Sequence, residues 1–422
     1  MVNGHGEDKI EAVRHTQQSL STKILLAAGR RSVVLAKQLG RYLEVDIDTA
    51  RCHPANEREV PKRPAESIVE ILLTSGTTGP PKAVGCTQAG LEFALRQVVS
   101  APSDSFPDQS AFVHHVMPGT QAAQRVLVQA LRGSRLTSIG VGSLSSEQFV
   151  EAVEIHKASR FVGMVPLTAR QIVRQCRRDD VLLPSVRWVS VGSAHVPPRL
   201  LEDIAQICPA ADALNMYGST EAGVARIYSR YPGRPGSLGR PEQGTVVEVR
   251  DDDGLPLPRG VRGELWIRSP GCPPRCYLYV NDPVRTELVF REGWVKTGDL
   301  ATEDEDGFVY LVGRRSEMIC LAGREVSPDE IEDCLLDHEL VNDVAVYGAP
   351  AESGGKEIVA AVVRAAFEMS PAAMRRVLEE HCRNRLQPFQ VPGRFLWLDA
   401  LPTGQFATVQ TRELRARHRS PS

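Results

Sequence analysis

The pattern of apolar and polar positions divides the chain into regions with different secondary structure. The apolar residues 68–73 predict a strand, and residues 88–99 predict a helix. Strand patterns return at 161–166, directly before a helical segment, and at 186–191. Because strands that alternate with helices usually pair in parallel, residues 20–235 predict an open, mostly parallel sheet with helices on its faces.

Short strands separated by turns replace this alternation after residue 235. Residues 245–250, 263–268 and 308–312 have the length and the apolar content of strands. They predict a small β-barrel or curled sheet over residues 236–312, attached to the α/β region.

A compact α+β region is expected from residue 314 to residue 422. Within it, Ser327-Pro328-Asp329-Glu330 has the form of a capping box, with serine as the N-cap, proline at the first helical position and glutamate three residues after the cap. This motif predicts a helix over residues 328–336. The expected fold is therefore an α/β protein with a large part over residues 1–313 and a small α+β part after it.

Composition excludes several classes of partner. The 50 Lys and Arg residues nearly balance the 52 Asp and Glu residues, so no field of one sign favours nucleic acid or an anionic membrane. The first ten residues have no apolar core of signal-peptide length, and no apolar stretch is long enough to span a bilayer. Nine scattered cysteines argue against a disulfide scaffold, so we expect a cytoplasmic protein.

Cys272 and Cys276 are the most closely spaced of these cysteines. Three residues separate them, and no second pair with metal-ligand spacing accompanies them. The sequence therefore predicts ordinary cysteines here and no metal site.

Residues 74–82, Thr-Ser-Gly-Thr-Thr-Gly-Pro-Pro-Lys, suit a polyphosphate. Hydroxyls and backbone N–H groups can surround phosphate oxygens, glycines allow close approach, and the lysine supplies a charge. A Walker loop is excluded because Pro80 and Pro81 precede Lys82, where that motif needs Gly-Lys-Ser/Thr. A polar surface linker is the alternative, but linkers seldom follow directly from a buried strand.

Two further segments suit a nucleotide. The first is residues 215–223, Asn-Met-Tyr-Gly-Ser-Thr-Glu-Ala-Gly. Its tyrosine offers a flat face to a base, and its Thr-Glu pair offers oxygen atoms to Mg²⁺. The alternative interpretation of this segment is a strand-to-helix turn with a capped helix. In the Gly298-Asp299 turn, the carboxylate can accept hydrogen bonds from both ribose hydroxyls, although an ordinary hairpin turn has the same residues.

These segments, in this order, resemble the signatures of the acyl-adenylate-forming enzymes, which include acyl-CoA synthetases, adenylation domains of peptide synthetases and luciferases. The resemblance covers roughly residues 65–416. It implies an AMP-forming ligase that uses ATP and Mg²⁺ to activate a small carboxylic acid. The acyl group would then pass to CoA, to the pantetheine of a carrier protein or to an amine.

The resemblance also implies roles for individual residues. Tyr217 would stack on adenine, Asp299 would bind the ribose, Thr220 would contact phosphate and Arg314 would lie near both. The implied catalytic residues are Thr74, Lys82, Glu221 and Arg314, with Thr74 and Glu221 as metal ligands. The implied nucleotide-binding residues are Thr74, Ser75, Gly76, Thr77, Thr78, Gly79, Lys82, Ser193, Asn215, Tyr217, Gly218, Ser219, Thr220, Asp299 and Arg314.

Family members rotate a mobile small domain between two half-reactions, and the resemblance places the hinge at Ser316. Ala322 and Gly323 would lie in the loop that lines a pantetheine tunnel. His195 follows a strand beside the expected acyl pocket, where a specificity role and a surface position are both open. For His114 and His115, in an apolar stretch, we expect a structural role.

The C-terminal signature departs from the family pattern. Ala407 and Thr408 stand where these enzymes have glycine and a lysine that bridges the substrate carboxylate and the phosphate. A threonine hydroxyl cannot supply that charge. Either Arg412 or Arg324 replaces it, or adenylation is weakened, or the protein is a transfer-only enzyme, or it is a nucleotide-binding pseudoenzyme.

Three other departures concern the surroundings of the site. Arg324 occupies a position where the family usually has glutamate, and Pro118-Gly119-Thr120-Gln121 places an amide where a bulky acyl-pocket residue is usual. Only some 70 residues precede the phosphate loop, fewer than in full-length relatives. We expect a carrier protein, a second copy of the chain or a shortened fold to cover that side.

Overall fold

The computed structural model describes strands β1 (Leu26–Ala27) and β2 (Leu43–Glu44) and residues 63–74, 82–100, 111–114, 120–121, 137–140, 145–351, 354–365, 369–404 and 408–418. Strands β1 and β2 pair in parallel. Several predicted site residues lie outside the described residues: Ser75, Gly76, Thr77, Thr78, Gly79, His115, Pro118 and Gly119.

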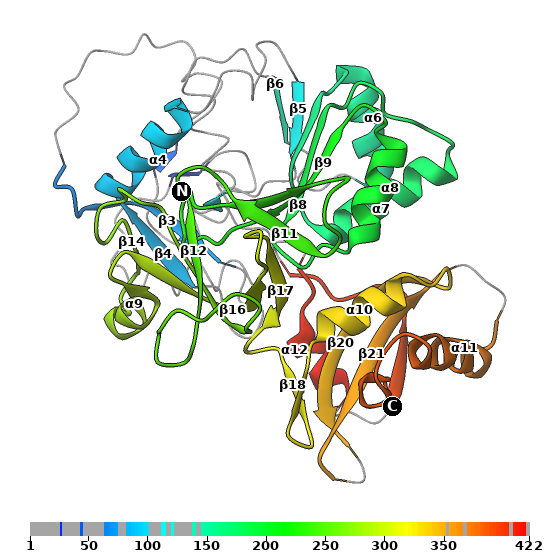
Figure 1. Ribbon diagram of the computed structural model, residues 1–422. Coiled ribbons are helices and arrows are strands. Elements are labelled where there is room, and N and C mark those ends of the chain that lie inside the picture. The colour runs from blue at the N-terminus through cyan, green and yellow to red at the C-terminus, as the bar shows by residue number, and fades with distance from the viewer. Residues whose placement is uncertain are drawn as a thin grey trace.

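Five parallel strands form one end of the main sheet, as the βα alternation predicts. Their order is β6 (Thr137–Gly140), β5 (Ala111–His114), β7 (Arg160–Met164), β8 (Trp188–Gly192) and β9 (Asp212–Tyr217). Helices α6 (Ser146–His156), α7 (Pro166–Arg178) and α8 (Pro198–Ile207) lie together beside these strands (Figure 1). Their buried faces share one apolar core with β7 and β8, which fixes the strand ends that reach the site.

The predicted short strands are present, and hydrogen bonds join them to the parallel strands in one twelve-stranded sheet. Strand β10 (Ile227–Arg230) pairs antiparallel with β9, and the sheet continues through β11 (Ser237–Pro241). The remaining members are β17 (Val309–Arg314), β16 (Trp294–Glu303), β15 (Phe290–Arg291), β13 (Gly263–Arg268) and β12 (Val246–Arg250). A separate apolar core around Ile227, Leu265 and Val309 stabilises this region.

A small antiparallel sheet holds the two ends of the predicted phosphate loop. It consists of β3 (Ile68–Leu73), β4 (Ala83–Thr87) and β14 (Tyr277–Tyr279), and helices α4 (Gln88–Ser100) and α9 (Pro283–Val289) adjoin it. The backbone N–H of Thr74 donates to the carbonyl of Lys82 at 3.0 Å. The ends of the segment between these two residues are therefore held side by side.

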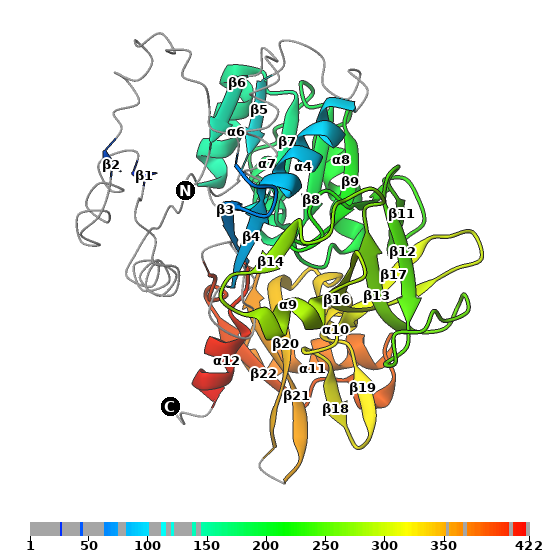
Figure 2. The same cartoon turned by 90° about the vertical axis from the view of Figure 1, so that its left-hand side faces the viewer.

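The C-terminal part begins with a hairpin of β18 (Ile319–Leu321) and β19 (Arg324–Val326). Its sheet consists of β20 (Val341–Pro350), β21 (Lys356–Arg364) and β22 (Arg394–Leu398). Its helices are α10 (Pro328–Leu336), α11 (Pro371–Arg383), α12 (Thr411–His418) and the short 3₁₀ helix η2 (Pro388–Gln390). Its sheet and helices share a core of their own. It lies below the large part in both views (Figures 1 and 2). The described residues include no helix long and apolar enough to cross a membrane.

The helix predicted at 328–336 is confirmed, but the predicted capping box is wrong. The Ser327 hydroxyl is buried without a hydrogen-bond partner among the described residues, because it packs against the backbone of Gly313, where a Cβ would lie 2.8 Å from it. Glu330 instead accepts a hydrogen bond from Gln390 of η2 at 2.6 Å. Tertiary contacts override the local capping pattern at this helix start.

Candidate active site

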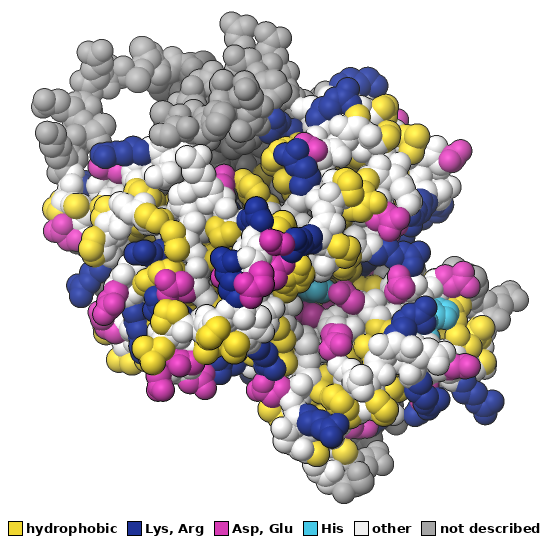
Figure 3. All heavy atoms as spheres, viewed as in Figure 1, with side chains coloured by type: hydrophobic (Ala, Val, Ile, Leu, Met, Phe, Trp, Pro, Cys, Tyr) yellow, Lys and Arg dark blue, Asp and Glu magenta, His cyan; other side chains and the backbone are white. Residues whose placement is uncertain are grey.

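A cavity of about 470 Å³ lies between the large part and the C-terminal part. Figure 3 shows acidic side chains and a histidine gathered at this junction. The ends of β8, β9 and β17 form one wall of the cavity, together with Asp299, which lies within β16 and not in the turn that the sequence predicted. This wall brings together seven of the predicted nucleotide-binding residues: Ser193, Asn215, Tyr217, Gly218, Ser219, Asp299 and Arg314.

Tyr217, Asp299 and Arg314 are in contact. The Tyr217 hydroxyl donates to Oδ2 of Asp299 at 2.7 Å, and Nη1 of Arg314 lies 3.4 Å from Oδ1. The register of β16 and β17 sets Asp299 opposite Arg314. Burial raises the pKa of the Asp299 carboxyl, and the charge of Arg314 and the Tyr217 hydrogen bond oppose that rise. The result is a buried acceptor beside an aromatic ring, which is the chemistry that a ribose and its base require.

The ends of β8 and β9 approach each other closely at Gly192. A Cβ on Gly192 would lie 2.2 Å from the carbonyl oxygen of Met216, so only glycine allows the two strand ends to approach this closely. The next residue, Ser193, has φ +67° and turns the chain into the cavity wall. This local geometry explains why a glycine ends β8.

Lys82, Tyr279 and Glu221 form a second group next to this wall. The Tyr279 hydroxyl donates to Oε1 of Glu221 at 2.7 Å, and Nζ of Lys82 lies 5.9 Å from the centre of the Tyr279 ring. Burial lowers the pKa of Lys82, and the Glu221 carboxylate opposes that effect. The Arg314 charge also lowers the pKa of Lys82. Arg314 is therefore close enough to interact electrostatically with Lys82 and Glu221 as well as with Asp299. Sequence reasoning missed Tyr279, which fixes the position of Glu221.

The residues present suit a magnesium ion held mainly by phosphate. The described residues include no group of three or more His, Cys, Asp or Glu side chains that could hold a metal on its own. Mg²⁺ commonly uses one or two protein carboxylates and takes its other ligands from phosphates and water. Glu221, supported by Tyr279, and the hydroxyl of Thr74 are hard oxygen donors of that kind.

The segment after Tyr217 is a turn and does not begin a helix. The Ser219 hydroxyl accepts from the N–H of Ala222 at 3.1 Å, and the turn leads directly to β10. Gln121 donates to the carbonyl of Gly223 and accepts from Arg226 at 3.2 Å, so this buried amide holds the turn. Thr220 also lies in this segment, but its side chain does not line the cavity.

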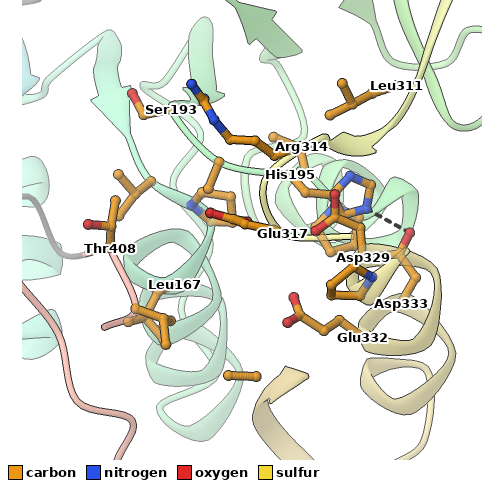
Figure 4. Close-up of a pocket in the computed structure, with 18 of the residues that line it drawn as sticks. Leu167, Ser193, His195, Leu311, Arg314, Glu317, Asp329, Glu332, Asp333 and Thr408 are labelled. Carbon is orange, nitrogen blue, oxygen red and sulfur yellow. Dashed lines mark hydrogen bonds and ion pairs between the residues drawn. The ribbon is translucent and has the colours of Figure 1, made fainter. Parts of the chain in front are cut away.

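The opposite wall of the cavity is acidic and comes from the C-terminal part. Asp329, Glu332 and Asp333 project from α10, and Glu317 joins them from the turn after β17 (Figure 4). Burial raises the pKa of Asp329 to about 6, and burial with the charge of Asp329 raises the pKa of Glu332 to about 8. Their spacing at i, i+3 and i+4 places them on one helix face, and this spacing is visible in the sequence.

His195 bonds across the boundary between the two parts. Its Nε2 lies 2.8 Å from Oδ2 of Asp333 (Figure 4). Burial lowers the pKa of this imidazole, but the hydrogen bond and the charge of Asp333 outweigh burial and raise it to about 9. His195 is therefore charged at neutral pH. It links α10 to the wall that contains Tyr217, Asp299 and Arg314, which we call the strand-end wall.

Three arginines of helices α7 and α8 form ion pairs with the C-terminal part. Asp343, which is 5% exposed, accepts from Nε of Arg170 and from Nη2 of Arg174, each at 2.9 Å. Nη1 of Arg199 lies 2.9 Å from Asp337. Sequence reasoning missed these pairs because nothing local marks residues more than 130 positions apart as neighbours.

The predicted C-terminal residues divide into those that reach the cavity and those that do not. Thr408 lines it, and its buried hydroxyl has no partner among the described residues. Arg412 of α12 also lines it, whereas Arg324 lies on the exposed hairpin over the ring of Phe389, at 4.8 Å, and does not. Ser316 lies in an exposed turn after β17, and Gly323 lies at the tip of the β18–β19 hairpin.

Comparisons with known proteins agree with this geometry. The family model described as AMP-binding enzyme matches residues 5–278, and the model of the AMP-binding enzyme C-terminal domain matches residues 330–405. A probable CoA ligase from Humulus lupulus is 29% identical and covers 81% of this chain. A 4-coumarate–CoA ligase-like protein from Arabidopsis thaliana is 26% identical and covers 83%. The chain spans less than two thirds of these relatives, 64% and 62% of their lengths.

Solved structures show the same fold. An anthranilate CoA ligase in complex with anthranoyl-AMP superimposes with a TM-score of 0.83 at 20% identity, covering 97% of this chain and 80% of that one. O-succinylbenzoate coenzyme A synthetase from Bacillus subtilis in complex with AMP gives 0.76 at 22% identity, covering 98% and 81%. Because the AMP-binding enzyme model matches most of the chain, the chain belongs to the AMP-binding enzyme family.

Proposed function

We propose that this protein is an AMP-forming ligase that activates a small carboxylic acid. ATP and the acid would give an acyl-adenylate and pyrophosphate, and the acyl group would pass to CoA, to a carrier-protein pantetheine or to an amine. The observation that carries this proposal is the contact of Tyr217, Asp299 and Arg314 beside the group of Lys82, Tyr279 and Glu221. It is supported by relatives named as CoA ligases and by similar folds that include complexes with ATP, AMP and anthranoyl-AMP.

Each group has a role in this proposal. Asp299 would accept the ribose hydroxyls while the base lies along Tyr217. Lys82 and Arg314 would neutralise the phosphate charge that develops as the carboxylate oxygen attacks the α-phosphorus and the bond to pyrophosphate breaks. Thr74 and Glu221 would hold Mg²⁺, which when bound would screen the charge of the departing pyrophosphate.

Arg412 is the residue that we propose in place of the family lysine. It lines the same cavity as Thr408, four positions earlier in the chain, whereas Arg324 does not line that cavity. A guanidinium supplies the positive charge that the Thr408 hydroxyl lacks. This assignment favours complete adenylation chemistry over a transfer-only enzyme.

We also propose that residues 314–422 move as a unit about Ser316. The exposed turn at Ser316 joins two regions with separate apolar cores, and the contacts between them that the structure describes are largely ion pairs. Polar interfaces of this kind are typical of parts that separate and dock again. Such movement would let the acceptor thiol or amine reach the acyl-adenylate.

The test is ATP–pyrophosphate exchange across a panel of carboxylic acids. We expect exchange that depends on one class of acid and that falls strongly in Asp299→Ala. ATP binding without exchange for any acid would favour a nucleotide-binding pseudoenzyme. Adding a synthetic acyl-adenylate and CoA then tests the transfer-only alternative, because only that enzyme would form thioester while lacking exchange.

A further inference from the structure

We propose that Cys272 and Cys276 form a redox-active dithiol that closes to a disulfide next to the candidate active site. Both are free thiols in the structure. They lie on the segment that leads into β14, the strand that ends with Tyr279. The sequence pattern gave them no role, and the proposed ligase chemistry does not use them.

The two side chains meet in one small apolar cluster. Cys276 is 3% exposed and belongs to the core of the three-stranded sheet, and the half-buried Cys272 packs against that core. The N–H of Cys272 donates to the carbonyl of Ser269 at 3.0 Å in a turn, and Arg275 has φ +60°. This turn and the left-handed residue fold the chain back between the two cysteines, so that both sulfurs share one site.

The surroundings of the two sulfurs give them different tasks. A hydrogen bond from the Cys276 thiol lowers the pKa of Cys272, although burial opposes it, and the same contact raises the pKa of Cys276. Cys272 is also the more exposed of the two. Because the thiolate is the reactive form, Cys272 is the sulfur that meets an oxidant, and Cys276 is the one that resolves the product.

Cys86 is close to this pair and belongs to the same core as Cys276. Strand pairing sets Cys86 opposite Tyr277, and its thiol donates to the carbonyl of Thr87 at 3.6 Å. The thiols of Cys272 and Cys276 are hydrogen-bonded to each other instead. The proposed disulfide is therefore the one within the 272–276 segment.

The oxidation is balanced with a hydroperoxide as the oxidant. The Cys272 thiolate attacks one peroxide oxygen, the O–O bond breaks, and the other oxygen leaves as water after protonation, which gives a sulfenic acid. The Cys276 sulfur then attacks the Cys272 sulfur, the S–O bond breaks, and a second water leaves. In total, two thiols and hydrogen peroxide give one disulfide and two waters, and a dithiol reductant reverses the change.

The position of the pair connects it with the phosphate side of the site, a link that rests on the proposed function. Tyr279 is three residues beyond Cys276, donates to Glu221 at 2.7 Å and lies against Lys82. There is little slack at Cys276, because a Cβ on Gly90 would lie 2.5 Å from its carbonyl oxygen. A disulfide draws the sulfurs to about 2 Å, closer than unbonded sulfurs can lie, so the 272–276 segment must adjust. The proposed link is that part of this adjustment reaches Tyr279 through β14.

Peptide mapping of the full-length protein tests the disulfide directly. The reduced protein is treated with hydrogen peroxide, free thiols are alkylated and the chain is digested with trypsin. Cleavage after Lys82, Arg96, Arg268, Arg275 and Arg285 puts Cys86, Cys272 and Cys276 on three different peptides. We expect a cross-link between peptides 269–275 and 276–285 that dithiothreitol removes.

Two variants control this experiment. Cys272→Ser should abolish the cross-link, whereas Cys320→Ser, which removes an exposed thiol elsewhere, should leave it unchanged. A cross-link to the Cys86 peptide, or oxidation of Cys272 to sulfinic acid with Cys276 still alkylated, would overturn the proposal. These readouts do not depend on ligase activity, so they stand or fall independently of the proposed function.

A second measurement tests the connection with the site. We expect ATP affinity to fall about threefold to tenfold on oxidation of the wild-type chain and to recover with dithiothreitol. Cys272→Ser, at the half-buried position, should show no such change, and thermal unfolding of the variant checks that it is folded. Equal affinities for the oxidised and reduced wild-type protein would overturn the link to Tyr279.

Discussion

The two walls of the cavity are held in place by different forces. On the strand-end wall, strand register sets Asp299 opposite Arg314, and Tyr217 of the same sheet donates a hydrogen bond to Asp299. On the opposite wall, α10 and Arg412 take their position from ion pairs such as Arg170 with Asp343. The first wall is set by the folding of one sheet, whereas the second depends on how two parts dock. Nucleotide binding and acid activation should therefore respond to different substitutions.

Removing Asp299 should have the largest effect, because it disrupts the wall that is fixed by the sheet. Asp299→Ala removes a charged acceptor for two ribose hydroxyls, so we expect ATP affinity to fall about 100-fold, measured by calorimetry. Asp253→Ala, which changes an exposed turn, is the matched control and should leave affinity unchanged. Wild-type affinity in Asp299→Ala would show that the nucleotide binds elsewhere.

Arg412 tests whether the opposite wall, which we call the docked wall, takes part in the adenylation reaction. Arg412→Ala should lower acid-dependent ATP–pyrophosphate exchange about 30-fold, the loss expected when one charge-assisted hydrogen bond to the reacting groups is removed. ATP affinity should change little, since the strand-end wall remains. Arg324→Ala is the control, and an equal loss in both variants would remove the assignment of Arg412.

Asp343 tests the docking itself. Asp343→Asn breaks the ion pairs with Arg170 and Arg174, which are partly exposed to solvent, so we expect a cost of about 1–2 kcal/mol to the docked arrangement. Limited proteolysis near Ser316 should become about tenfold faster, while ATP affinity stays within a factor of two. Asp399→Asn is the exposed control. Unchanged proteolysis would contradict the role of these ion pairs.

The pH dependence of docking should be the smallest effect. The pKa of His195 is raised from its ordinary value of 6.5 to about 9 by Asp333. A raised pKa means that the contact stabilises docking fully below about pH 6.5 and that this contribution is lost as pH rises through about 9. Proteolysis near Ser316 should therefore accelerate between pH 7 and pH 10 in the wild type. Glu332, whose pKa is raised to about 8, also titrates in this range. In His195→Gln the acceleration should therefore become smaller without vanishing, and an identical profile would exclude His195.

The sequence predicts the strand-end wall better than the docked one, for a physical reason. The strands at 68–73 and 263–268 follow from local apolar patterns, and the helix at 328–336 is predicted from the motif at 327–330. Tyr217 and Asp299 stand in recognisable segments, although Asp299 lies within β16 and not in the predicted turn. The capping box failed because Ser327 is buried against Gly313, a contact that no local pattern encodes.

The docked wall depends on pairs that are distant in the chain. His195 and Asp333 are 138 residues apart, and Arg170 and Asp343 are 173 apart. Charges on surface helices are common, so neither partner is distinctive alone. The acidic face of α10 could be predicted from its spacing, but the residues that it meets could not.

Oxygen-18 transfer tests the central claim most directly. The protein is incubated with ATP, Mg²⁺, CoA and an acid whose carboxylate contains ¹⁸O, and the products are analysed by mass spectrometry. If an acyl-adenylate forms and its acyl group then passes to the acceptor, one ¹⁸O atom must remain on the phosphate of AMP. Labelled AMP together with pyrophosphate is the predicted result. Formation of ADP and phosphate, or of AMP without label while the acid is consumed, would contradict the account.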